Sequence, residues 1–110
     1  MDYRKLATDF AAALVARDFS RAYAMTSSSY RAQTTLPAMQ HAFEETVRPI
    51  EPLGDIHLMN TMEAWPAKRA DDVGWAYVAI DGSWWGEAVA VVITRESGTL
   101  RIREVEWGRP

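Results

Sequence analysis

The sequence contains no cysteine among its 110 residues. This absence excludes disulfide bonds, thiol catalysis and zinc sites built from thiolates, and it fits a reducing compartment. No apolar run approaches the roughly 20 residues that a membrane-spanning helix needs. Asp9, Arg17 and Asp18 interrupt the apolar N-terminal stretch, which is therefore unlike a signal peptide. We expect a cytoplasmic protein with no membrane partner.

Basic residues are outnumbered by acidic residues, and only two histidines are present. Twelve Lys and Arg residues stand against 15 Asp and Glu residues, which gives a formal net charge of −3. Nucleic-acid binding requires a clustered basic surface, whereas Arg101 and Arg103 form only a short basic stripe. The two histidines, His41 and His57, lack the HxH or HxxxH spacing of a metal site. We therefore expect no nucleic-acid partner, no metal and no cofactor.

Helical periodicity fills the first half of the chain, which has the length and the 48% hydrophobic content of one globular domain, residues 1–110. Apolar residues recur with helical spacing over residues 3–14, and a shorter helix is expected over 19–25. The run 26–29 ends this second helix, because Ser and Thr side chains compete for backbone hydrogen bonds. A third helix is expected over 35–48, where a following proline stops it.

The second half has the character of an antiparallel sheet. Residues rich in aromatic and β-branched side chains predict four strands, at 56–65, 73–80, 84–95 and 100–107. Asp81-Gly82 and Ser97-Gly98 are signals for two-residue hairpin turns. The sequence therefore predicts an α+β domain in which three N-terminal helices pack on a four-stranded antiparallel sheet.

The two turns predict which strand residues share a face. The first turn pairs Val78 with Trp85, and the second pairs Val91 with Glu104. One face is expected to pack on the helices and holds Val78, Ile80, Trp85, Val89, Val91, Ile93, Leu100 and Ile102. The same face carries three carboxylates, from Glu87, Glu104 and Glu106. Buried carboxylates need partners or water, so this end of the sheet is expected to line a cavity or to open to solvent.

The opposite face of the predicted sheet is aromatic and basic. It holds Trp75, Tyr77, Trp84, Val105 and Trp107, together with Thr94, Arg101 and Arg103. An exposed apolar patch of this kind indicates a partner surface, and Trp, Tyr and Arg are enriched at binding hot spots. We expect the interface residues to be Trp75, Tyr77, Trp84, Arg101, Arg103 and Trp107. A bulge or a one-residue slip would exchange the two faces.

The order of elements resembles that of the nuclear transport factor 2-like superfamily, whose members fold as a cone-shaped, cystatin-like α+β domain. The resemblance is carried by the segment from Phe10 to Tyr30, with its Arg17-Asp18-Phe19 step and Ala22-Tyr23 pair, by a further helix and by the meander of long strands. It implies a bent sheet that wraps the first helix, a pocket at the wide end and dimerisation through the outer face. It does not imply one activity, because the superfamily contains isomerases, dehydratases, polyketide cyclases, transport adaptors and immunity proteins.

The pocket that the resemblance implies would be lined by Phe10, Leu14, Tyr23, Tyr30, Trp85, Glu87, Glu104 and Glu106. The leading hypothesis is a non-catalytic binding domain that forms a homodimer. It would hold a small hydrophobic ligand in this pocket or a protein partner on the aromatic face. An immunity-type protein that neutralises a partner is a special case of this hypothesis.

Two other classes of function remain open. The domain could be a small lyase or isomerase that acts on a hydrophobic carbonyl compound. Glu104 would then be the base, and Tyr23 or Tyr30 would be the proton donor. The specific Tyr and Asp placement of the superfamily's isomerases cannot be matched in this sequence. The domain could also be a purely structural association module, which predicts a well-packed cone without a cavity.

Overall fold

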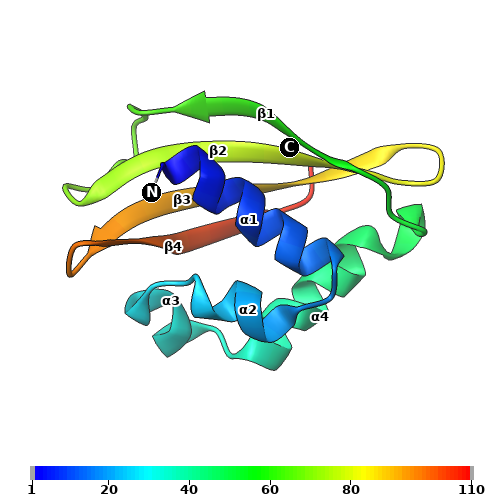
Figure 1. Ribbon diagram of the computed structural model, residues 1–110, viewed down its shortest axis with the longest axis horizontal. Coiled ribbons are helices and arrows are strands. Elements are labelled where there is room, and N and C mark those ends of the chain that lie inside the picture. The colour runs from blue at the N-terminus through cyan, green and yellow to red at the C-terminus, as the bar shows by residue number, and fades with distance from the viewer. Residues whose placement is uncertain (1, 110) are drawn as a thin grey trace.

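The computed structural model describes residues 2–109, which form an α+β domain (Figure 1). The helices come first and are α1 (Tyr3–Val15), α2 (Phe19–Ala24), α3 (Ser28–Gln33) and α4 (Leu36–Val47), followed by a 3-10 turn at Arg48–Ile50. The strands are β1 (Ile56–Met62), β2 (Asp72–Asp81), β3 (Gly86–Glu96) and β4 (Thr99–Trp107). They form one antiparallel sheet in the order β1-β2-β3-β4. The predicted α+β class and four-stranded antiparallel sheet are confirmed.

The prediction of three helices is wrong, because α3 was missed. Each α-helix begins after a residue whose side chain accepts a hydrogen bond from a backbone N–H of the first turn, namely Asp2, Asp18, Ser27 and Thr35. The serine-rich run at 26–29 was expected only to end a helix. The Ser27 hydroxyl instead accepts a hydrogen bond from the backbone N–H of Tyr30 at 3.1 Å and so begins α3. A serine hydroxyl that bonds to the backbone disturbs a helix interior, but at a helix start the same hydroxyl satisfies a backbone N–H that has no partner within the helix.

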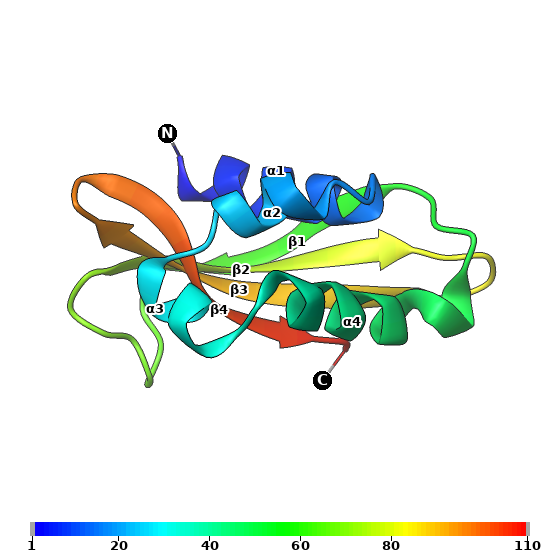
Figure 2. The same ribbon diagram turned by 90° about the horizontal axis from the view of Figure 1, so that it is seen from below.

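The helices pack against one face of the sheet, which is called the inner face here (Figures 1 and 2). α1 lies across the sheet and contacts all four strands, whereas α3 and α4 contact β4. Phe10 and Leu14 of α1 and Met39 and Phe43 of α4 are fully buried in the core between the layers. Large side chains therefore fill the space between α1, α4 and the sheet.

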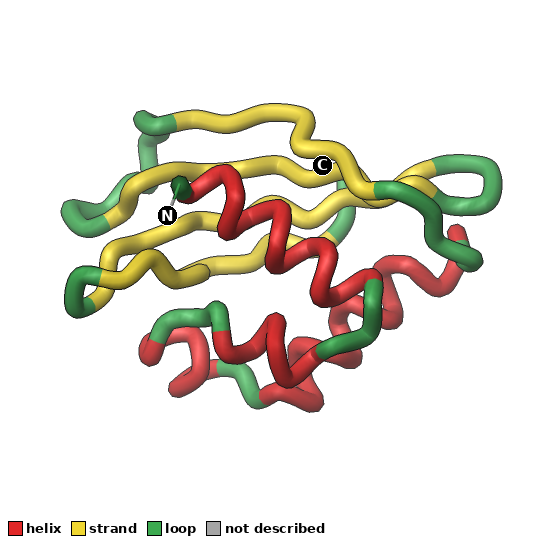
Figure 3. The backbone as a smooth tube through the Cα atoms, viewed as in Figure 1, coloured by secondary structure: helices red, strands yellow, loops and turns green. Residues whose placement is uncertain are grey.

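The hairpin between β2 and β3 has a longer loop than the sequence predicts (Figure 3). Ile80 pairs with Glu87 rather than with Ser83, a displacement of four residues, and residues 82–85 form the loop. The displacement is even, so the paired residues of the two strands keep their predicted faces. The predicted places of Trp84 and Trp85 on the strand are wrong, because both lie in the loop. Trp84 is 78% exposed there.

The hairpin between β3 and β4 has the predicted two-residue turn but contains a bulge farther along. Ile93 pairs with Ile102 as predicted, whereas Val92 pairs with Glu104. Arg103 is therefore an extra residue in β4 at this point. From Glu104 to Trp107, each β4 residue lies on the opposite face from the one that the turn alone predicts.

The bulge overturns four predicted placements at the end of β4. Val105 and Trp107 lie on the inner face and pack against the core, and the Trp107 ring makes an edge contact with Phe43 at a centroid distance of 6.3 Å. Glu104 and Glu106 lie on the outer face. The predicted inner-face placement of the two glutamates and the predicted outer-face placement of Val105 and Trp107 are wrong.

Candidate functional site

The residues predicted to line a pocket are dispersed over the structure. Phe10 and Leu14 are fully buried in the core. Tyr23 is partly buried, and its hydroxyl donates a hydrogen bond of 2.9 Å to a backbone carbonyl between α3 and α4. Tyr30 and Glu104 are brought together, because both line a cleft beside β4.

The three remaining residues of that set lie in other places. Trp85 is partly buried and packs against the core from the β2–β3 loop. Glu87 accepts a hydrogen bond of 3.1 Å from the backbone N–H of Arg109. Glu106 is exposed on the outer face of β4. These three residues do not line the cleft that contains Tyr30 and Glu104.

Glu104 has surroundings different from those that its predicted catalytic role requires. Its side chain is 61% exposed, and its nearest cation is Nη1 of Arg103, 3.8 Å from Oε1. The lyase or isomerase hypothesis placed this carboxylate against apolar walls on the inner face. The bulge at Arg103 instead turns it toward solvent on the outer face.

The outer face of the sheet carries an aromatic pair above small residues. Trp75 pairs with Val92 and Tyr77 pairs with Ala90 across the β2–β3 ladder. The two rings have centroids 6.2 Å apart with an interplanar angle of 31°. Val92 and Ala90 are buried although they face away from the helices. The neighbouring aromatic side chains therefore cover the middle of this face.

The borders of the outer face are polar or charged. Glu104 and Glu106 pair with Val92 and Ala90 and so form the β4 border. Asn60 pairs with Tyr77 on the β1 side and is exposed. The outer face consequently has an aromatic and apolar centre between polar margins.

A buried ion pair lies at one end of this outer face and was not found from the sequence. Nε and Nη2 of Arg103 donate to the two carboxylate oxygens of Asp72 at 2.8 and 2.7 Å. The Asp72 side chain has no exposed surface, and that of Arg103 is 10% exposed. The backbone N–H of Arg69 donates to the same carboxylate at 2.8 Å. The pair joins β2 to β4 across β3.

The protonation of Asp72 is controlled by opposing effects. Burial alone raises the pKa of its carboxyl group. Hydrogen bonds from Arg103, from the backbone N–H of Arg69 and from the Thr94 side chain outweigh burial and hold the pKa below its usual value. The hydrogen bond to Asp72 likewise raises the pKa of Arg103. Both groups are therefore charged at neutral pH.

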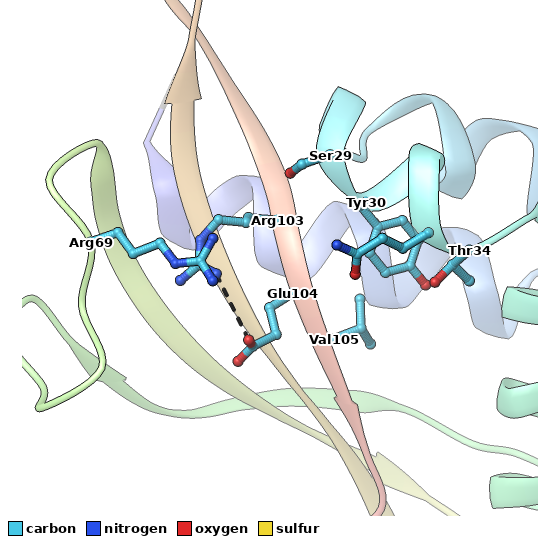
Figure 4. Close-up of a pocket in the computed structure, with 8 residues that line it drawn as sticks. Ser29, Tyr30, Thr34, Arg69, Arg103, Glu104 and Val105 are labelled. Carbon is cyan, nitrogen blue, oxygen red and sulfur yellow. Dashed lines mark ion pairs between the residues drawn. The ribbon is translucent and has the colours of Figure 1, made fainter.

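A cleft of about 240 Å³ lies between α3 and β4 (Figure 4). The residues that line it come from α3 and the segment after it, from the loop before β2 and from β4; they are Ser29, Tyr30, Gln33, Thr34, Arg69, Arg103, Glu104 and Val105. Burial raises the pKa of Tyr30 to about 12, so its phenol is protonated at neutral pH. The lining is mostly polar rather than hydrophobic.

Of the eight residues that line the cleft, the sequence placed only Tyr30 and Glu104 in a pocket, and the other six were missed for a physical reason. Gln33 lies in the helix that was missed, and Arg69 lies in a loop without a local pattern. These segments approach Glu104 only through the tertiary fold, so no spacing in the sequence connects them. The available signal was Ser27, whose position before a short polar segment is typical of a helix start.

Within residues 2–109, no helix is long and apolar enough to cross a membrane. The same residues contain no cluster of three or more His, Asp or Glu side chains that could hold a metal ion.

No protein-family model, curated protein or solved structure matched this chain.

Proposed function

We propose that this chain is a non-catalytic association domain that forms a homodimer through the outer face of its sheet. The observation that carries the proposal is the aromatic pair of Trp75 and Tyr77 at the centre of that face. The helices lie on the inner face, and both rings remain partly exposed on the outer face. Large aromatic side chains held on a rigid sheet are efficient anchors for a protein interface.

The size of the outer face supports a second copy of the chain as its partner. Strands β2, β3 and β4 contain 10, 11 and 9 residues. With strands about 4.8 Å apart and a rise of about 3.4 Å per residue, the four-stranded sheet covers roughly 600 Å² in projection. Side chains enlarge this area toward the roughly 800 Å² per partner of a standard interface.

The distribution of charge on the outer face fits the same arrangement. The centre formed by Trp75, Tyr77, Ala90 and Val92 carries no charge. Glu104, exposed at the β4 border, would remain at the solvated edge of a dimer. An apolar centre with a polar rim is the usual anatomy of a specific interface.

Sedimentation equilibrium tests the proposal directly. The wild-type chain is expected to dimerise at micromolar concentration. The Trp75→Ala substitution is expected to weaken the dimer by about 30-fold or more, because truncation of an interface hot spot costs about 2 kcal/mol or more. Trp84→Ala is the matched control, since Trp84 is exposed in the β2–β3 loop rather than on the sheet face. A wild-type chain that stays monomeric at high micromolar concentration, or equal weakening by the two substitutions, would contradict the proposal.

A further inference from the structure

Two of the side chains that line the cleft between α3 and β4, those of Arg69 and Gln33, have unused bonding capacity. The backbone of Arg69 is bound to Asp72, but its guanidinium group makes no ion pair or hydrogen bond with any residue in the range 2–109. The side-chain amide of Gln33 likewise has no hydrogen-bond partner within the part of the chain described. A ligand in the cleft would therefore meet donors that need not first break an internal bond.

The charged groups of the cleft differ in how far other side chains already satisfy them. Arg103 is neutralised by its two hydrogen bonds to the buried carboxylate of Asp72. Glu104 has only the 3.8 Å contact with Arg103, which is too long for a hydrogen bond. The guanidinium of Arg69 and the hydrogen-bonding capacity of the Glu104 carboxylate, which makes only this long ion pair, are consequently left to act on a ligand.

The free edge of β4 adds backbone groups to the cleft. Gly108 donates its N–H to Ala88 of β3, so in an antiparallel ladder Glu106 also faces β3, whereas Val105 faces away. Among the described residues, the N–H and C=O of Val105 have no partner outside the sheet. Val105 lines the cleft and offers one donor and one acceptor there.

We infer that this cleft binds a small zwitterion of amino-acid size, with its carboxylate on Arg69 and its ammonium group on Glu104. A simple anion would meet the carboxylate of Glu104, and a simple cation would meet the guanidinium of Arg69. A ligand that carries both charges satisfies both residues. The volume of about 240 Å³ lies below the range of roughly 300–1,000 Å³ for drug-sized ligands, so the occupant is small.

This inference is independent of the proposed homodimer. Trp75 and Tyr77 do not line the cleft, which lies at the edge of β4. Binding measured in the Trp75→Ala variant as well as in the wild-type chain therefore separates the two proposals. A result that contradicts one of the two proposals leaves the other proposal unaffected.

The test compares three ligands of the same shape by NMR titration of the isotope-labelled chain. The probes are L-leucine, L-leucinamide, which lacks the carboxylate, and 4-methylpentanoate, which lacks the ammonium group. L-leucine is expected to shift the amide signals of Val105 and Gln33 in a saturable way. Each analogue is expected to bind about tenfold or more weakly, because it loses one charge-assisted hydrogen bond.

Two substitutions test which residue binds the carboxylate of the ligand and which binds its ammonium group. Arg69→Gln is expected to weaken L-leucine about tenfold without affecting L-leucinamide, whereas Glu104→Gln is expected to weaken L-leucine without affecting 4-methylpentanoate. The matched controls are Lys68→Gln in the same loop and Glu106→Gln on the same strand, since neither residue lines the cleft. The inference is overturned if millimolar L-leucine produces no saturable shift, if the three probes bind equally, or if the control substitutions weaken binding as much.

Discussion

Replacement of Arg103 with alanine is expected to lower the free energy of unfolding by about 3–5 kcal/mol, the usual effect of breaking one side of a buried ion pair. The substitution removes the two hydrogen bonds of 2.8 and 2.7 Å to Asp72. The Asp72 side chain has no exposed surface in the folded chain, so its carboxylate would lose its charge partner in a poorly solvated position. The backbone N–H of Arg69 remains but cannot balance the charge.

Urea denaturation at one fixed protein concentration measures this loss, because association would otherwise alter the apparent stability. Arg48→Ala provides the control. Arg48 forms an i,i+3 ion pair with Glu45, but both side chains are largely exposed, and such pairs contribute about 0–1 kcal/mol. Equal losses for the two substitutions would show that the pair between Arg103 and Asp72 is not buried as described.

The same ion pair predicts a pH dependence of stability. The pKa of Asp72 is lowered in the folded state, so the charged carboxylate stabilises the fold at pH values above its unfolded pKa of about 3.9. This contribution is lost as the pH falls through the lower folded pKa. The difference in unfolding free energy between the wild-type chain and Asp72→Asn is therefore expected to be largest near neutral pH and to shrink below about pH 4. A difference in unfolding free energy that stays constant down to about pH 2–3, below the unfolded pKa of Asp72, would contradict the lowered pKa of this carboxyl group.

The two hairpins show where the local sequence is sufficient to predict a turn and where it is not. At the β3–β4 turn, Ser97 and Gly98 have φ values of 50° and 79°, the left-handed backbone that a two-residue turn requires. The equally strong signal at Asp81-Gly82 failed for a tertiary reason. A side chain at Gly82 would come within 2.4 Å of Ile50 Cβ, so this glycine permits close packing of the loop on the 3-10 turn. Local propensity cannot anticipate that contact.

The bulge at Arg103 had the largest effect on the predicted site. The strand pattern of β4 contains no glycine or proline that would indicate an extra residue. The Arg103 guanidinium lies over the outer face, as the turn alone predicts, and the buried carboxylate of Asp72 binds it there. Because this partner is 31 residues away in the sequence, only the assembled sheet reveals it. The aromatic pair of Trp75 and Tyr77 kept its predicted face because the β2–β3 pairing was displaced by an even number of residues.

Phe43→Ala is expected to lower the free energy of unfolding by about 3–5 kcal/mol, the range for removing a buried phenylalanine ring. Phe43 is fully buried in α4 and makes edge contacts with the rings of Phe19 and Trp107, at centroid distances of 5.9 and 6.3 Å. It therefore connects α4 to α2 and to the end of β4. Thermal and urea denaturation measure the loss. Leu58→Ala is the control and is expected to cost much less, because Leu58 is partly exposed at the edge strand β1.

A double-mutant cycle between Phe43 and Trp107 tests the bulge itself. Without the bulge, Trp107 would lie on the outer face, and its substitution would be additive with that of Phe43 within about 0.3–0.5 kcal/mol. With the bulge, the two rings touch, and a coupling of about 0.5–1.5 kcal/mol is expected. Leucine at both positions keeps the variants folded while removing the ring contact. Coupling between Phe43 and Tyr77, which lies on the outer face, should be absent in the same experiment. Additive effects at Phe43 and Trp107 would contradict the bulge. They would support the register that the turn alone predicts, in which Glu104 lies on the inner face.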